Sequence, residues 1–93
     1  MNKRQIASTI AKVEQYCIKR GVRLTPIRRQ VLELLLTYSN IVKAYEILDE
    51  LKKQRENAAP PTVYRALDFF VEIGVLHRAE SLNGFVFCNH FDE

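Results

Sequence analysis

Two neighbouring side chains, Tyr64 and Arg65, follow a pair of prolines in the stretch PPTVYRAL at residues 60–67. An arginine guanidinium near the start of a helix offers a planar fork of donors that matches the two acceptors on a guanine edge. A tyrosine ring beside it can pack on a thymine methyl group or bond a phosphate oxygen. Thr62 and the free N–H groups of a first helical turn suit phosphate oxygens. The stretch therefore predicts a surface that reads double-stranded DNA.

The same spacing leaves a second interpretation open. Tyr64 could pack in the core while Arg65 pairs with Asp68 or Glu72 on the surface of its own helix. The two interpretations differ in a simple observable, because only the first one requires both Tyr64 and Arg65 to be exposed.

A second set of reactive side chains, His77, Cys88 and His90, lies near the end of the chain, around the turn signal SLNG. If residues 82–83 form the turn of a hairpin, His77 lies opposite Cys88. If residues 83–84 form it, His77 lies opposite His90. The two registers differ by an even step, so the three side chains share one face of the hairpin in either case.

An imidazole and a thiolate on one face are ligands that favour Zn²⁺ over Mg²⁺ or Ca²⁺. The hairpin therefore predicts part of a zinc site made by His77 and Cys88, with His90 as a weaker candidate. The alternative is a buried strand thiol at Cys88 and an ordinary surface imidazole at His77.

Apolar spacing predicts the elements that position these groups. We expect helices at residues 3–20, 26–38, 43–55 and 61–74, and a hairpin at residues 75–90. Gly21 is placed to end the first helix in a left-handed conformation, and Cys17 lies on its apolar stripe as a core residue. Thr25 and Pro26 begin the second helix as cap and first residue.

This order predicts a mainly α-helical fold with a small β-hairpin, a winged helix-turn-helix preceded by one additional helix. In that architecture the helix before the hairpin enters the major groove of DNA. At 93 residues, of which 47% are hydrophobic, the chain is long enough for one core, and we expect a single domain spanning residues 1–93.

Charge is distributed unevenly along the chain. Residues 1–30 contain eight Lys or Arg residues and one acid, a net charge of +7, whereas residues 31–93 contain six basic and ten acidic residues, a net charge of −4. A basic segment favours an anionic partner, most simply nucleic acid, although it also suits a plain solvated surface. On this basis Arg23, Arg28 and Arg29 are candidate phosphate contacts.

Several classes of protein are disfavoured. We expect neither a membrane segment nor a secretory signal, which favours a cytoplasmic protein with reduced thiols. No nucleophile with a base and no glycine-rich phosphate loop is evident, so we do not expect an enzyme. A winged helix that binds another protein through an apolar patch around Phe69 stays open as an alternative.

The motifs RLTPIRRQVLELL and PPTVYRALDFFVEIGVLHR resemble the ferric uptake regulator family of bacterial metal-dependent repressors, over about residues 21–88. Within that family the motifs are most similar to the branch of zinc uptake regulators. The resemblance implies that Tyr64 and Arg65 lie on the recognition helix. It also implies that Arg23 approaches an adjacent minor groove and that Tyr45 adds a DNA contact.

The resemblance further implies a repressor of zinc-uptake genes, with iron or another metal as the alternative signal. It implies that the full-length protein binds DNA as a homodimer, with a monomer as the open alternative for this 93-residue chain alone. His77 and Cys88 occupy positions of the regulatory zinc site, whose other ligands would come from a dimerisation domain that we expect to be absent from this chain. Lys43 departs from the family pattern, because relatives often cap the third helix with Ser or Thr. We expect Asn40 to substitute as that cap.

Overall fold

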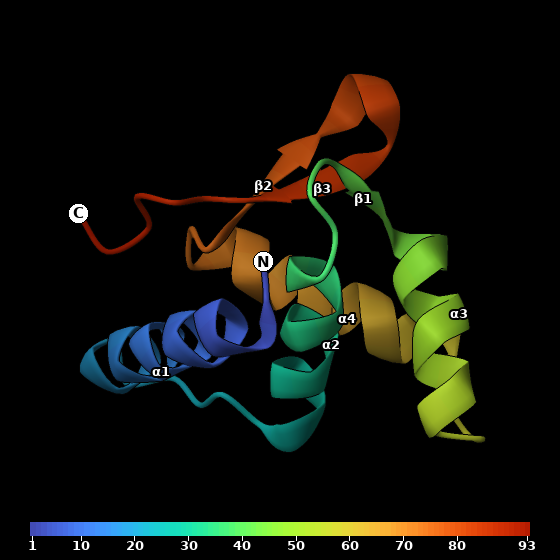
Figure 1. Cartoon of the computed structure of the whole chain (residues 1–93), viewed down its shortest axis with the longest axis horizontal. Helices are drawn as coiled ribbons and strands as arrows, with labels where there is room; N and C mark the ends of the chain where they lie inside the picture. Colours follow the sequence, from blue (N-terminus) through green and yellow to red (C-terminus); the bar gives the residue numbers. More distant parts are fainter.

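The computed structural model describes the backbone of residues 1–93 and every side chain except that of Glu80. Four helices and three short strands follow one another along the chain, as Figure 1 shows. Their order is α1 (Lys3–Lys19), α2 (Pro26–Leu36), β1 (Val42–Lys43), α3 (Ala44–Gln54), α4 (Pro60–Glu72), β2 (Leu76–Ala79), a single 3₁₀ turn (Glu80–Leu82) and β3 (Gly84–Phe87). The helices begin and end within two residues of the predicted ranges.

The ends of α1 and α2 are formed by local signals that the sequence contains. Gly21 adopts a left-handed φ of 71° after α1, and the Val22 N–H donates to the Cys17 carbonyl at 3.0 Å, which closes a Schellman motif. Thr25 caps α2 by accepting from the Arg28 N–H at 3.4 Å, with Pro26 in the first helical position. Both predicted boundaries are confirmed.

The start of α3 differs from the expectation. Lys43, not Asn40, is the residue before the helix, and its side chain offers no acceptor for a cap. The Glu46 carboxylate instead accepts from the Lys43 backbone N–H at 3.3 Å. The prediction of Asn40 as the cap is therefore wrong.

The sheet is antiparallel in the order β1-β3-β2, and its first strand was not predicted. Two residues, Val42 and Lys43, pair with Phe85 and Gly84. A strand this short has no alternation to detect in a sequence. Its contribution is to attach the start of α3 to the hairpin, so that helix and wing hold a fixed mutual position.

Both predicted hairpin registers are wrong. His77 pairs with Val86, and Ala79 pairs with Gly84, because a 3₁₀ turn lengthens the connection between the strands. Asn83 takes a left-handed φ of 51° at the end of this connection, a conformation that asparagine tolerates better than most residues. The shift from the predicted registers is still even, so the predicted faces of the hairpin are retained.

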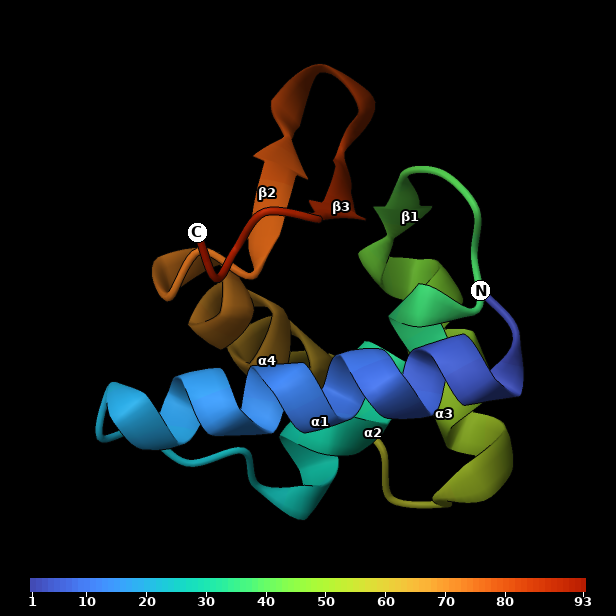
Figure 2. The ribbon, with the colours of Figure 1, turned by 60° about the vertical axis from the view of Figure 1, so that its left-hand side comes forward.

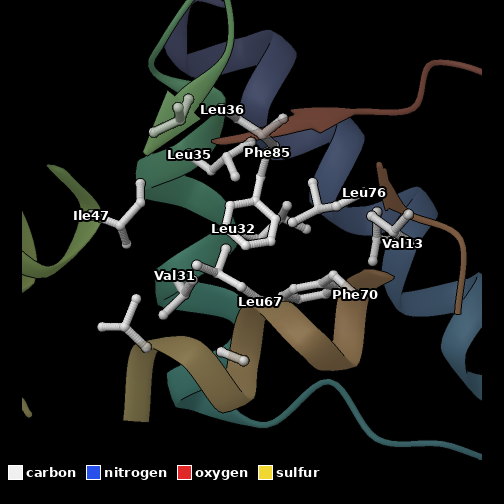
Figure 3. Close-up of a cluster of buried hydrophobic side chains, with 14 of the residues drawn as sticks. Val13, Val31, Leu32, Leu35, Leu36, Ile47, Leu67, Phe70, Leu76 and Phe85 are labelled. Atoms are coloured by element: carbon white, nitrogen blue, oxygen red, sulfur yellow. The ribbon is translucent and has the colours of Figure 1, made fainter. Parts of the chain in front are cut away.

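A continuous core holds these elements together. Figure 3 shows side chains from α1, α2, α3, α4 and the sheet converging on one interior, with Leu32, Leu67 and Phe70 near its middle. Leu67 and Phe70 are fully buried, as is Cys17, which is confirmed as a core residue. In Figure 2, α1 lies across α2 while the hairpin projects away from the helices.

None of the helices among the described residues is both long and apolar enough to span a bilayer.

An aromatic cluster attaches the last residues of the chain to α1. The rings of Tyr16 and Phe91 meet edge to face at 5.1 Å, and Phe87 meets Phe91 at 5.7 Å. The Tyr16 hydroxyl also donates to the Ile73 carbonyl, the residue that ends α4, at 2.7 Å. One side chain thus contacts both the end of α4 and the segment after the wing.

Truncation of the core side chain Leu67 to alanine should lower the free energy of unfolding by about 2–5 kcal/mol, because a fully buried leucine leaves a cavity. The control is Ile18→Ala on α1, where the side chain is 62% exposed and a change within about 0.5 kcal/mol is expected. Urea unfolding followed by circular dichroism measures both. Equal losses in the two variants would contradict this description of the core.

Candidate nucleic-acid interface and metal-binding residues

Tyr64 and Arg65 lie on the outward side of α4, in its second turn. Tyr64 is 50% exposed and Arg65 is exposed, while the neighbouring Val63 and Ala66 are buried. Arg65 has no ion-pair partner within the described part of the chain. The alternative in which Tyr64 enters the core and Arg65 pairs along its own helix is therefore wrong.

A hollow of about 670 Å³ lies between the start of α3, the start of α4 and the wing. Tyr64 lines it from α4, and Tyr45, which is 56% exposed, lines it from α3. The other residues that line it are Lys43, Ala44, Arg78, Asn83, Gly84 and Phe85. We call this hollow the interface groove. The sequence interpretation proposed Tyr45 and Tyr64 separately, and the structure brings the two phenols to one groove.

The first turn of α4 has no free N–H groups, contrary to the prediction. Pro60 and Pro61 are the first two helical residues and carry none. The next two N–H groups, those of Thr62 and Val63, both donate to the Ala59 carbonyl, at 3.0 and 3.4 Å. Backbone donation to a phosphate is therefore unavailable at this helix start. Only the hydroxyl of the half-buried Thr62 can fill the predicted role there.

Two of the candidate arginines are engaged within the molecule. The Arg28 guanidinium lies 3.7 Å from the centroid of the Phe69 ring and donates to the Arg23 carbonyl at 2.7 Å. Arg29 donates to Glu14 at 2.7 Å, which joins α2 to α1. Arg23 itself is exposed in the connection between these helices. Phosphate contacts by Arg23, Arg28 and Arg29 stay predictions.

Sequence reasoning missed Arg78 as part of the groove. Its guanidinium donates to the Asp68 carboxylate of α4 at 2.9 Å and lies 5.3 Å from the centroid of the Phe85 ring. The signal was present in the alternation of β2, because Arg78 follows Leu76 by two residues and so shares the face that meets α4. The predicted arrangement of helix and wing did not specify which residues of that face contact α4.

The predicted zinc ligands lie on the hairpin but do not face each other. His77 is exposed opposite Val86, and the half-buried Cys88 continues the ladder by donating its N–H to the Val75 carbonyl at 2.9 Å. Alternation places His77 and Cys88 on one face as diagonal neighbours, with Cβ atoms about 7–8 Å apart or slightly less. Zinc bonds of about 2.0–2.3 Å can bridge such a pair. The imidazole and thiol therefore fit two positions of a zinc site.

His90 lies outside this arrangement. It follows the strand in a turn and its Nδ1 is 3.1 Å from the Glu93 carboxylate, on a largely exposed surface. No group of three His, Cys, Asp or Glu side chains that could hold a metal ion occurs among the described residues. His77 and Cys88 would accordingly need further ligands from outside residues 1–93 or from solvent.

The two cysteines have contrasting environments. Cys17 is fully buried, and burial raises the pKa of its thiol; Arg28 opposes this increase and Glu14 adds to it. A raised pKa depletes the reactive thiolate at neutral pH. Cys88 is only half-buried and free, so it is the thiol that a metal or reagent reaches.

Comparison with known proteins identifies relatives of the whole chain. The model of the ferric uptake regulator family matches residues 19–87. The zinc uptake regulation protein of Escherichia coli (strain K12) is 44% identical over 93 residues, which is 100% of this chain and 54% of that relative. The zinc uptake regulation protein of Shigella flexneri gives the same values. The chain thus spans about half the length of the curated relatives that it matches.

Solved structures agree with these relatives. A zinc uptake regulator complexed with zinc and DNA matches with a TM-score of 0.90 and 44% identity, over 95% of this chain and 59% of that one. The crystal structure of holo XcZur matches with a TM-score of 0.80 and 53% identity, over 89% of this chain and 57% of that one. The likeness confirms the winged-helix fold.

The difference between the two thiols has a measurable consequence. In the native chain at neutral pH, a single thiol should react rapidly with a disulfide reagent, and Cys88→Ser should remove that fast phase. Cys17 should react only slowly, because burial both blocks access and raises its pKa. Denaturant should make both react. A fast phase that persists in Cys88→Ser would contradict this assignment.

Proposed function

The chain belongs to the ferric uptake regulator family, and on this premise we propose that it is the DNA-binding part of a zinc-responsive repressor of zinc-uptake genes. The main support is the pair Tyr64 and Arg65, exposed on α4 beside the interface groove. Its relatives include a zinc uptake regulator complexed with zinc and DNA. The proposed partner is a double-stranded operator in the cytoplasm, and the proposed activity is binding rather than catalysis.

In the proposed complex α4 lies in the major groove of DNA. Arg65 reads a guanine edge through its planar fork of donors, while Tyr64 packs on a thymine methyl group or bonds a phosphate. Tyr45 contacts the same stretch of DNA from the other side of the interface groove, and Thr62 donates its hydroxyl to a phosphate. Arg23 reaches an adjacent minor groove. Arg28 and Arg29 add charge near phosphates and support the surface through their contacts with Phe69 and Glu14.

The proposed zinc response involves the wing. His77 and Cys88 would hold the ion from one face of the hairpin, and the ion would supply a rigid link between the wing and the remaining ligands. The wing is attached to α3 through β1 and shares the buried core with α4, so a link at the wing would also orient the recognition helix. In a homodimer this orientation would set the spacing of two recognition helices on the operator.

One observation bears on the alternative of a protein-interaction module. That alternative relies on an apolar patch around Phe69, but Phe69 is half-buried, stacked by Arg28 on one ring face and packed edge to face against Phe70. A patch covered by a guanidinium offers little apolar surface to a partner. DNA is the partner that the exposed groups favour.

The variant Arg65→Ala should lose sequence discrimination, because a bidentate arginine–guanine contact is worth about 1–3 kcal/mol, roughly 5- to 150-fold in affinity. The matched variant Arg65→Lys keeps the charge but not the fork, so it should bind scrambled duplexes like the wild type while discriminating poorly. A duplex selected by the chain from a random pool, compared with its scrambled version by fluorescence anisotropy, measures both. Unchanged discrimination in Arg65→Ala would reject the base-reading role.

The zinc response is tested in a form of the protein that supplies the zinc ligands beyond His77 and Cys88. Zinc should increase its affinity for a selected duplex, and Cys88→Ser should remove that increase because the site loses a thiolate. The control His90→Ala should keep the response, since His90 lies in a turn beside Glu93 and away from the ladder. Equal affinities with and without zinc in the wild type would exclude zinc as the signal.

A further inference from the structure

Beside the interface groove, which Arg78 lines, an ion pair joins α4 to the wing. The Arg78 Nη2 atom of β2 donates to the Asp68 Oδ1 atom of α4 at 2.9 Å. The two side chains are 45% and 60% exposed, and the guanidinium also lies 5.3 Å from the centroid of the Phe85 ring. The pair therefore lies on the surface that α4 and the wing would present to DNA.

The place of Asp68 on α4 is unusual for a DNA-facing surface. Helical spacing puts it three and four residues after Arg65 and Tyr64, on the same outward side, where a lone carboxylate would repel phosphates. Arg78 presents the opposite problem. An unpaired guanidinium on a wing attracts the phosphates of any duplex, and such contacts add affinity without sequence information.

We propose that Asp68 is a specificity-determining residue, which holds the Arg78 guanidinium and so keeps the wing from binding DNA of arbitrary sequence. The inference rests on the proposed DNA binding. An ion pair this exposed contributes little to folding stability. Substitution of Asp68 should therefore leave the fold intact, and its effect should appear in DNA binding. Phe85 also helps to hold the Arg78 side chain, because the guanidinium lies over its ring.

The test is Asp68→Asn in the chain, with a labelled duplex of scrambled sequence and an anisotropy titration at several salt concentrations. Release of Arg78 adds one phosphate contact, so the variant should bind this duplex more tightly, and the slope of log affinity against log salt should steepen by about 0.9. The double variant Asp68→Asn/Arg78→Gln should return to the slope of the wild type. Discrimination between a selected duplex and the scrambled one should fall in Asp68→Asn.

The matched control is Glu72→Gln, which removes one negative charge from an exposed position one turn later on the same helix. It should leave the slope unchanged, because Glu72 has no ion-pair partner among the described residues. Wild-type slopes in Asp68→Asn, or an equal steepening in Glu72→Gln, would overturn the proposal. A wild-type chain that binds no duplex at any salt concentration would instead reject the proposed function, on which this inference depends.

Discussion

The complete burial of one stripe of α4 is the constraint on which the other features depend. Four side chains of this helix are at most 3% exposed, namely Val63, Ala66, Leu67 and Phe70. Successive residues of a helix are rotated by a fixed angle about its axis. Burial of that stripe therefore requires the side chains of Tyr64, Arg65 and Asp68 to point outward. Pro60 and Pro61 add to this by setting where the helix begins. The chemistry of the surface is thus a consequence of how the core is packed.

Positive charge is used in two different ways. Residues 1–30 are strongly basic, but the structure employs Arg29 to join α2 to α1 and Arg28 to cover Phe69. On the wing, Arg78 is neutralised by Asp68. By contrast, Arg65 is left without an acidic partner in the part of the chain that the structure describes. The number of basic residues in a segment is therefore a poor measure of the charge that a partner meets.

Much of the fold could be predicted because its signals are local. Apolar spacing, Gly21, Thr25 and Pro26 determine helices and helix ends within a few residues, and the exposure of Tyr64 and Arg65 follows from the same spacing. What could not be predicted depends on contacts distant in sequence. The two-residue strand β1 exists only because β3 lies beside it.

The candidate site shows the same division. The hairpin register depends on a 3₁₀ turn that neither dipeptide signal specifies, so the faces of His77 and Cys88 were predicted but not their partners. The lack of two N–H groups at the start of α4 could have been predicted, because two prolines stand there in the sequence. Sequence reasoning placed the helix start one residue too late and so overlooked it. Arg78 and Asp68 meet only when wing and helix are packed together.

The side chain of Tyr16 joins two segments that the chain separates by two strands and a turn. Its hydroxyl donates to the carbonyl of Ile73, the cap residue after α4, and its ring packs edge to face against Phe91. Loss of the Tyr16 side chain would therefore remove two contacts at once, one to the residue after α4 and one to the segment after β3. The position of the segment after β3 is thus coupled to the end of α4 through one side chain of α1.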